Sequence, residues 1–201
     1  MRIIGVTGPS GAGKGAVSAV LKSENIKIID ADAVYHSVIA PPSECLDELV
    51  DFFGGDILSV SGELDRPSLS KKVFGEENKD NLLILNRITH KYVSKRIDEL
   101  LKEYRVENII ACVIDAPLLI EAGLDKICDF TVAVLADKNI RAERLVARDN
   151  INFEAVMKRI ESQKSDKFYI DNSDYTLYNN GEIQELHNKI EEIVTKEGVY
   201  H

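Results

Sequence analysis

Two kinds of hydrophobic pattern alternate along the chain. Short unbroken apolar runs are typical of parallel strands buried on both faces, and apolar residues that recur every three or four positions are typical of helices packed on such a sheet. The expected strands cover residues 3–6, 26–29, 109–114, 130–135 and 175–178. Helical spacing follows residue 14 and recurs over residues 46–53, 82–104, 140–148, 153–163 and 183–194. This alternation predicts an α/β fold in which helices cover both faces of a parallel sheet.

Acidic and hydroxyl residues stand where several of the expected strands end. They are Thr7, Asp30, Asp32, Asp115 and Asp137. Because ligands of open parallel sheets bind beyond the carboxyl ends of the strands, we expect the functional site at this edge.

The overall composition is ordinary for a globular protein, with 44% hydrophobic and 29% charged residues. A length of 201 residues suits a single domain that carries smaller insertions. The net charge of −9 argues against a protein that grips a nucleic-acid backbone over a broad surface, but it is compatible with a local basic pocket for phosphates.

The cysteine spacing and the hydropathy of the chain indicate in which cellular compartment we expect the protein. The three cysteines, Cys45, Cys112 and Cys128, form no C-x-x-C pair, so neither a zinc site nor a disulfide framework is indicated. No secretory signal precedes the first apolar run, and no apolar segment approaches the roughly 20 residues of a membrane span. We therefore expect a cytoplasmic protein with no membrane partner.

The most informative stretch is GPSGAGKGA at residues 8–16. It fits the phosphate-loop pattern G-x-x-x-x-G-K-[ST] at Gly8, Gly13 and Lys14, between an expected strand and an expected helix. Gly11 and Gly13 let the backbone turn so that successive N–H groups point at one centre, and the helix adds its positive end. The alternative is a glycine-rich turn that only links strand to helix. The context on both sides favours a phosphate cradle, with Lys14 as a mobile charge for the β- and γ-phosphates.

One position of the loop departs from this pattern. Gly15 stands where a Ser or Thr hydroxyl normally contacts Mg²⁺. Phosphate binding should survive, because the amides and Lys14 do not depend on that hydroxyl, but the metal must be held by nucleotide oxygens, water or a carboxylate. Asp115 is placed like the second acidic motif of P-loop proteins. It is equally placed to cap a turn before Pro117, and both interpretations stay open.

Candidates for an acceptor site lie after the second expected strand. A kinase that acts on a hydroxyl needs a carboxylate to orient it and take its proton, and Asp30 and Asp32 in IIDAD are available. Only one of the two can face the loop if the strand continues, and both can instead be turn or helix-capping acids. Arg66 and His90 are either surface groups or ligands of an anionic substrate.

Three arginines share one face of an expected helix. Arg141, Arg144 and Arg148 stand at i, i+3 and i+7, and three cations on one face repel unless anions meet them. They either pair with nearby acids such as Glu143 and Asp149, or belong to a lid that closes over a triphosphate and stabilises the charge of the transferred group.

Together these features resemble the dephospho-coenzyme A kinase family over nearly the whole chain. The matching segments are GVTGPSGAGK at 5–14, IIDAD at 28–32, LDRPSL at 64–69, ITHKYV at 88–93, DAPLLIEAG at 115–123 and ERLVARD at 143–149, with Gln163 following. The order of these segments, together with DAPLLIEAG, makes the resemblance specific.

The resemblance implies a P-loop kinase fold with a five-stranded parallel core, a helical acceptor-binding subdomain and a lid. By position, the core is expected at 1–32, 107–138 and 168–201, the acceptor-binding subdomain at about 33–106 and the lid at about 139–167. The implied reaction is ATP-dependent phosphorylation of the ribose 3′-hydroxyl of 3′-dephospho-CoA, which forms CoA and ADP in the last step of coenzyme A synthesis. ATP, with Mg²⁺, and 3′-dephospho-CoA are therefore the expected partners.

The resemblance also assigns residues by position. The implied catalytic residues are Asp32 as the base, Lys14 and Arg144. The implied ATP-binding residues are Gly8, Ser10, Gly11, Ala12, Gly13, Lys14, Gly15, Ala16, Arg148 and Asn179. The implied acceptor-binding residues are Asp32, Arg66, His90, Pro117 and Leu118, and Asp115 is the expected metal residue, acting directly or through water. Arg144 and Arg148 match the lid arginines of the family, whereas Arg141 does not and is expected to be a surface charge.

The chain departs from the family pattern at three places. The family usually has G-K-S-T where this chain has Lys14-Gly15-Ala16, so both hydroxyls are absent. Nucleoside monophosphate kinases often have G-K-G-T, which makes a glycine after the lysine compatible with catalysis. The family's H-P step is His90-Lys91 here.

The third departure lies near the C-terminus, where the family usually has I-D-N. Counted from Gln163, the expected place falls on YTLYNNG, with Tyr178 in place of the Asp and Asn179 as the candidate near the adenine. We interpret the nearer match at residues 170–172 as coincidental.

Two other functions stay open at this point. The glycine after Lys14 motivates a nucleoside monophosphate-type kinase with another small acceptor, although IIDAD and DAPLLIEAG count against it. The loss of both loop hydroxyls motivates a catalytically weak nucleotide-binding or regulatory protein, although the joint presence of Lys14, Asp32, Arg144 and Arg148 counts against it. The sequence is compatible with a monomer or a small homo-oligomer.

Overall fold

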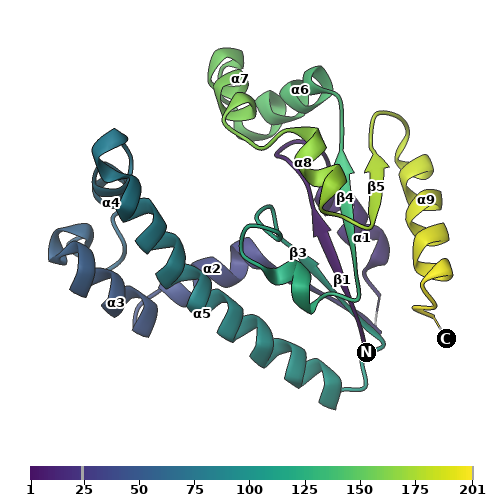
Figure 1. Ribbon diagram of the computed structural model, residues 1–201, viewed down its shortest axis with the longest axis horizontal. Coiled ribbons are helices and arrows are strands. Elements are labelled where there is room, and N and C mark those ends of the chain that lie inside the picture. The colour runs from purple at the N-terminus through teal and green to yellow at the C-terminus, as the bar shows by residue number, and fades with distance from the viewer. Residues whose placement is uncertain (24, 201) are drawn as a thin grey trace. The chain divides into compact units, whose positions relative to one another are not determined.

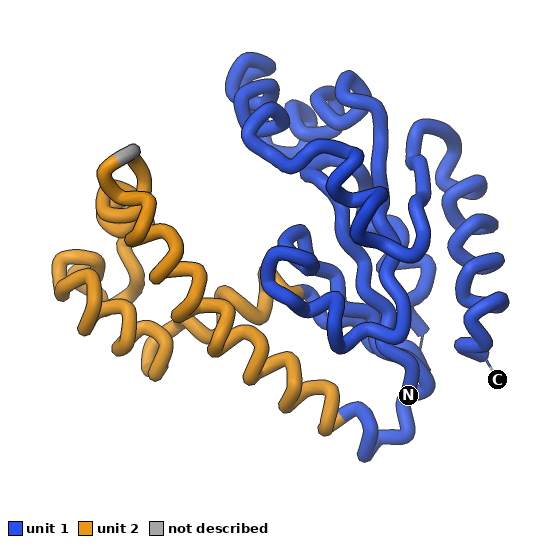
Figure 2. The backbone as a smooth tube through the Cα atoms, viewed as in Figure 1, with its two compact units in different colours: residues 1–30, 104–201 blue, residues 31–103 orange. Residues whose placement is uncertain are grey.

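The computed structural model describes residues 1–23 and 25–200. The chain divides into two compact units, one formed by residues 1–30 and 104–201 and the other by residues 31–103, as Figure 2 shows.

The first unit is built on a five-stranded sheet in the order β2-β3-β1-β4-β5. Figure 1 labels β3, β1, β4 and β5 of this sheet. Its strands are β1 (Arg2–Thr7), β2 (Ile26–Asp30), β3 (Ala111–Asp115), β4 (Phe130–Leu135) and β5 (Tyr175–Tyr178). Each pair of neighbouring strands is parallel. The predicted parallel α/β sheet is confirmed, and β4 and β5 have the bounds that the apolar runs predicted.

Helices cover both faces of this sheet. On one face, α1 (Lys14–Leu21) and α9 (Ile183–Lys196) pack on a core that includes Ile4, Val113 and Val132. On the other face, Tyr169 of α8 (Asp166–Asp171) packs against Ala133 and Leu135 of β4. The alternation of side chains along each strand sends apolar residues to both covers, which is why the strand sequences are almost continuously apolar.

Two further helices of the first unit follow β4. They are α6 (Lys138–Asp149) and α7 (Phe153–Glu161), and their facing side chains form a small core of Ala142, Leu145, Val156 and Ile160. A short 3₁₀ helix, η3 (Leu124–Ile127), lies between β3 and β4. Helix α8 was not predicted, because a helix of six residues is too short for its periodicity to be recognised.

The second unit is helical. It contains α2 (Ala31–Ile39), α3 (Glu44–Phe53), η1 (Gly55–Ile57), α4 (Arg66–Val73), η2 (Glu76–Asn78) and most of α5 (Lys79–Val106). Its core comprises Ile39, Cys45, Leu49, Phe53, Ile57, Leu69, Val73 and Ile88.

Local capping residues fix where the helices of this unit begin. The Ser43 hydroxyl accepts a hydrogen bond from the Leu46 amide at 3.1 Å at the start of α3. The Asp65 carboxylate accepts one from the Ser68 amide at 3.4 Å at the start of α4, where Pro67 occupies the first turn. Side-chain acceptors at these positions satisfy amides that have no partner inside the helix.

The structure corrects the expected setting of Asp32. Strand β2 ends at Asp30, and α2 begins at Ala31, so Asp32 lies in the first turn of a helix and not at the end of a strand. Among the described residues, no helix is both long enough and apolar enough to cross a membrane.

Candidate active site

The loop between β1 and α1 is held in one shape by close packing. At Gly8, with φ +138°, an added Cβ would collide with the Val134 carbonyl oxygen, and at Gly13, with φ +100°, it would collide with the Asn179 amide. Side chains are excluded from both positions by space and by backbone conformation. The Lys14 ammonium folds back over the loop and donates to the Gly8 carbonyl at 2.9 Å. The loop is therefore a preformed cradle with a cation beside it, which is the arrangement that binds phosphate.

Two carboxylates stand together at the ends of neighbouring strands beside this loop. Asp30 of β2 and Asp115 of β3 are register partners, and Asp115 is also in register with Val6 of β1. Asp115 accepts a hydrogen bond from the Ser18 hydroxyl of α1, with 2.7 Å between Oγ and Oδ2. Residues in register on parallel strands point to the same face of the sheet, so the two acids concentrate negative charge at one point.

This donor set fits a magnesium ion that is shared with a nucleotide. Over residues 1–23 and 25–200, no group of three or more His, Cys, Asp or Glu side chains is placed to hold a metal by itself. Mg²⁺ characteristically keeps several waters and binds through one or two carboxylates plus substrate phosphates. Asp115, with Asp30 beside it, supplies that number of carboxylates.

Arg144 and Asn179 border the phosphate loop from two other elements. The Arg144 guanidinium on α6 donates to the Asn179 carbonyl at 3.0 Å and to the Gly11 and Ala12 carbonyls at 3.4 Å each. Asn179, which follows β5, is buried, and its side-chain amide donates to the Ala12 carbonyl at 2.9 Å. The structure thus brings both sequence-predicted residues to the backbone of the loop.

The expectation that Arg141 is a surface charge is wrong. Only 5% of Arg141 is exposed, and burial lowers the pKa of its guanidinium. Its Nε donates to the Ser10 carbonyl at 3.0 Å, and its Nη2 donates to Oε1 of Gln163 at 2.7 Å. Gln163 in turn donates to the Ser10 hydroxyl at 2.7 Å. Arg141 and Gln163 therefore hold Ser10, and with it the tip of the phosphate loop.

Arg148 and an arginine that sequence reasoning missed are joined by one acid. Asp149 accepts from Arg148 at 2.6 Å and from Arg159 at 2.8 Å, and the hydrogen bonds to Arg148 lower the pKa of the Asp149 carboxyl. Arg159 of α7 also donates to the Ser10 hydroxyl at 3.4 Å. The available signal was its position four residues before Gln163 within the expected helix over residues 153–163, although α7 itself ends at Glu161.

Two residues of the DAPLLIEAG segment follow β3. The Pro117 carbonyl accepts a hydrogen bond from the Thr7 hydroxyl at 3.3 Å, which joins this turn to the end of β1. Leu118, in the same turn, is 53% exposed. The I-D-N sequence at residues 170–172, which we interpret as a coincidental match to the family pattern, covers the end of α8 and the residue after it. Asn179, the candidate at the expected place, follows β5.

The remaining sequence-predicted residues belong to the second unit. Asp32 is exposed on α2, Arg66 is exposed at the start of α4, and His90 is partly buried on α5. Nη2 of Arg66 lies 2.6 Å from Nδ1 of His36, and since a guanidinium only donates, the imidazole nitrogen accepts. His36 was not predicted, and its partnership with Arg66 fixes the direction of that guanidinium.

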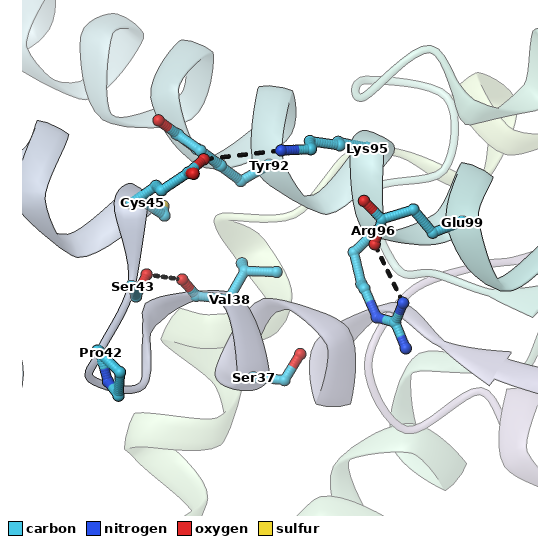
Figure 3. A pocket seen from close by; sticks show the side chains of 10 residues that line it. Ser37, Val38, Pro42, Ser43, Cys45, Tyr92, Lys95, Arg96 and Glu99 are labelled. Carbon is cyan, nitrogen blue, oxygen red and sulfur yellow. Dashed lines mark hydrogen bonds and ion pairs between the residues drawn. The ribbon is translucent and has the colours of Figure 1, made fainter.

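The second unit also contains a cavity of about 190 Å³ between α2, α3 and α5, shown in Figure 3. Two of its cations are already paired, Lys95 with Glu44 at 3.6 Å and Arg96 with Glu99 at 3.0 Å. Burial raises the pKa of the Cys45 thiol in its wall to about 11. None of the sequence-predicted acceptor residues lines this cavity.

Comparison with known proteins shows the family of this chain. The family model described as dephospho-CoA kinase matches residues 2–185. Among curated relatives, the dephospho-CoA kinase of Corynebacterium efficiens is 35% identical over 193 residues, which cover 96% of each chain. The dephospho-CoA kinase of Fusobacterium nucleatum is 37% identical over 189 residues, which cover 94% of this chain and 95% of the relative.

A solved structure shares the fold. The protein TT1252 from Thermus thermophilus superposes with a TM-score of 0.79 at 28% identity, over 97% of each chain. This chain belongs to the dephospho-CoA kinase family.

Proposed function

We propose that this protein is an ATP-dependent kinase that phosphorylates the ribose 3′-hydroxyl of 3′-dephospho-CoA. The observation that carries the proposal is a preformed phosphate loop with Lys14 folded over it and Arg144 on its rim, in a chain that matches the family from residue 2 to residue 185. ATP is the phosphoryl donor, and CoA and ADP are the products.

The first unit supplies the nucleotide site. Backbone amides of the loop and the ammonium of Lys14 bind the β- and γ-phosphates, and Arg144 stabilises the charge that spreads over the transferred group. Asn179 is proposed to lie near the adenine. We propose that α6 and α7, with Arg148 and Arg159, form a lid over the triphosphate, with Asp149 as the acid that holds both guanidiniums before the nucleotide binds.

A magnesium ion would be held by Asp115, with Asp30 beside it, and by the oxygens of the nucleotide. Such an ion neutralises charge that develops on the β- and γ-phosphates. The chain contributes fixed carboxylate oxygens, since Ser18 restrains Asp115.

The second unit supplies three of the five proposed acceptor residues, Asp32, Arg66 and His90, whereas Pro117 and Leu118 follow β3 in the first unit. Asp32 orients the 3′-hydroxyl and takes its proton while the hydroxyl oxygen forms a bond to the γ-phosphorus and the bond from that phosphorus to the bridging oxygen of ADP breaks. Arg66, aligned by His36, together with His90, Pro117 and Leu118, binds the anionic and apolar parts of the acceptor.

The proposal is tested by measuring CoA formation from ATP, Mg²⁺ and dephospho-CoA, with AMP, CMP and shikimate as competing acceptors. We expect turnover with dephospho-CoA and little with the others. Faster turnover of another acceptor would support kinase activity but would show that dephospho-CoA is not the preferred acceptor. Tight ATP binding without turnover of any acceptor would contradict the proposal.

A matched pair of variants tests the base. Asp32→Asn keeps the size of the side chain and removes its proton acceptor, so the rate should fall by about 10²–10⁴-fold. Asp51→Asn changes an exposed acid of α3 in the same unit and should retain the wild-type rate. A near-normal rate in the Asp32 variant would remove Asp32 from the mechanism.

A further inference from the structure

The phosphate loop of this chain carries no hydroxyl after its lysine. Gly15 occupies the position where P-loop proteins place the Ser or Thr that helps to hold Mg²⁺ together with a strand-end aspartate, and the next residue, Ala16, has no hydroxyl either. Helix α1, with the sequence KGAVSAVL, has its one hydroxyl at Ser18. Ser18 stands three residues after Gly15 and therefore lies on the same face of α1, one turn further along.

The Ser18 hydroxyl is buried and points to the strand-end acid. Ser18 is 6% exposed, and its Oγ donates to Oδ2 of Asp115 at 2.7 Å. A serine inside a helix usually points to solvent or bonds to a carbonyl one turn earlier. Here the proton is given to a carboxylate 97 positions away in the sequence, and a hydrogen bond to a charged acceptor is among the stronger ones in proteins.

This contact restrains the carboxylate at the place where the metal is needed. Asp115 ends β3, directly beside β1, which leads into the phosphate loop, and it is in register with Asp30 of β2. A bond on Oδ2 limits rotation of the carboxylate group, and second partners of this kind orient metal-binding side chains and strengthen metal binding.

We propose that Ser18 replaces the orienting part of the missing loop hydroxyl. Ser18 is a positioning residue that holds Asp115 for the Mg²⁺ of the bound nucleotide, and nothing about the backbone amides or Lys14 has to change. This inference rests on the proposed function, because it assumes that the loop binds a nucleotide with its metal.

The competing explanation is that the bond only ties α1 to the sheet. A structural role would lower stability on mutation but would leave the effect of Mg²⁺ on nucleotide affinity unchanged. The two explanations are separated by measuring ATP affinity by calorimetry with Mg²⁺ and with EDTA, and by taking the ratio of the two dissociation constants.

In the wild-type protein we expect Mg²⁺ to strengthen ATP binding. In Ser18→Ala this enhancement should fall about tenfold, while affinity in EDTA stays close to that of the wild type, because a hydrogen bond to a charged group is lost and 1.4 kcal/mol corresponds to a factor of ten. Ser18→Cys keeps a similar side-chain volume and a weak hydrogen-bond donor, so its Mg²⁺ enhancement should lie between those of the wild type and of Ser18→Ala. This variant replaces Ser18→Ala in the experiment if the alanine variant does not fold.

The matched control removes a similar bond at the other end of the sheet. Thr131, near the start of β4, is 5% exposed and donates from Oγ1 to Oδ2 of Asp174 at 2.8 Å. Thr131→Val should lower the unfolding temperature without changing the ratio of the two affinities.

A second arm restores the hydroxyl where other P-loops have it. A Cβ at Gly15 would meet no heavy atom within 4 Å, and the backbone there is not in the left-handed region, so serine is accommodated. Adding Gly15→Ser to Ser18→Ala should recover most of the lost Mg²⁺ enhancement.

Two results would overturn the proposal. One is a folded Ser18→Ala variant with the wild-type ratio, and the other is a wild-type ATP affinity that does not respond to Mg²⁺. Failure of the proposed function is a separate result, namely no CoA from dephospho-CoA in a protein whose ATP affinity still responds to Mg²⁺ in the way described.

Discussion

Replacing Arg141 by methionine tests whether the first half of α6 is fixed to the phosphate loop. Arg141→Met keeps most of the buried aliphatic stem and removes the guanidinium. The substitution takes away the donors to the Ser10 carbonyl and to Oε1 of Gln163, at 3.0 Å and 2.7 Å. Gln163 keeps a second donor in the Ser10 amide, at 3.3 Å, so the main loss is at the Ser10 carbonyl.

The expected size of the effect follows from these contacts. A buried acceptor left without its partner costs about 1–3 kcal/mol, and hydrogen bonds to charged groups contribute about 1.5–3 kcal/mol each. Against this, the desolvation that lowers the pKa of Arg141 is relieved by a neutral side chain. We therefore expect a net loss of about 2–3 kcal/mol, which for a protein of this size lowers the unfolding temperature by about 4–12 °C.

The assay is thermal unfolding followed by circular dichroism, together with ATP affinity at a temperature where the variant is folded. Arg148→Met is the matched control, because it makes the same change on the same helix at an exposed guanidinium whose partner is Asp149. The control should unfold much closer to the wild type, and the Arg141 variant should also bind ATP more weakly because the tip of the loop is no longer held. Wild-type unfolding and wild-type affinity in Arg141→Met would refute the argument that Arg141 braces the loop.

Three other predictions concern the loop, its rim and the buried thiols. Gly13→Ala should abolish ATP binding measurable by calorimetry, because a Cβ at this position meets the Asn179 amide and the backbone is left-handed. The control Gly15→Ala adds a methyl group in open space and should bind ATP normally. Equal ATP affinities of the two variants would contradict the packing argument. Arg144→Met should lower kcat for CoA formation by about 10²–10³-fold with a smaller change in KM, and a change in KM alone would mean that Arg144 only binds substrate. Burial raises the pKa of the Cys112 and Cys128 thiols to about 12. Between the pKa of a thiol in the unfolded chain and this raised pKa, both thiols therefore stay protonated in the folded protein but lose their protons on unfolding. The free energy of unfolding should therefore be unaffected below about pH 8.5 and should fall above it by up to about 1.4 kcal/mol per pH unit for each thiol, as measured by urea titration, and Cys112→Ala should reduce that slope; a stability that rises over this range would contradict the burial of these thiols.

The sequence determined the elements whose signals are local. The apolar runs located all five strands, because residues buried on both faces of a sheet must be apolar at successive positions. The loop at residues 8–16 was recognisable because its glycines, its lysine and the following helix are contiguous in the chain. The segments that carry the family resemblance were likewise readable in order along the sequence.

Short helices and the faces of helices were beyond the reach of the pattern. Helix α8 has too few residues for a period to be recognised, and α4 has few apolar positions between its polar ones. The spacing of Arg141, Arg144 and Arg148 showed that they share a face, but not that the first of them is buried against the loop while the last is exposed. The sequence shows which residues share a face of a helix, but whether that face is buried or exposed depends on the elements packed around the helix.

Tertiary structure alone decided which polar groups meet. The Ser18 hydroxyl reaches Asp115 because α1 packs on the parallel pairing of β1 and β3, and the guanidinium of Arg141 reaches Ser10 from 131 positions away. Propensity and periodicity depend on neighbours within a few residues, whereas a hydrogen bond needs two atoms about 3 Å apart, which sequence separation does not encode. The sequence therefore predicts a phosphate loop, and only the tertiary structure shows which side chains hold that loop and the Asp115 carboxylate.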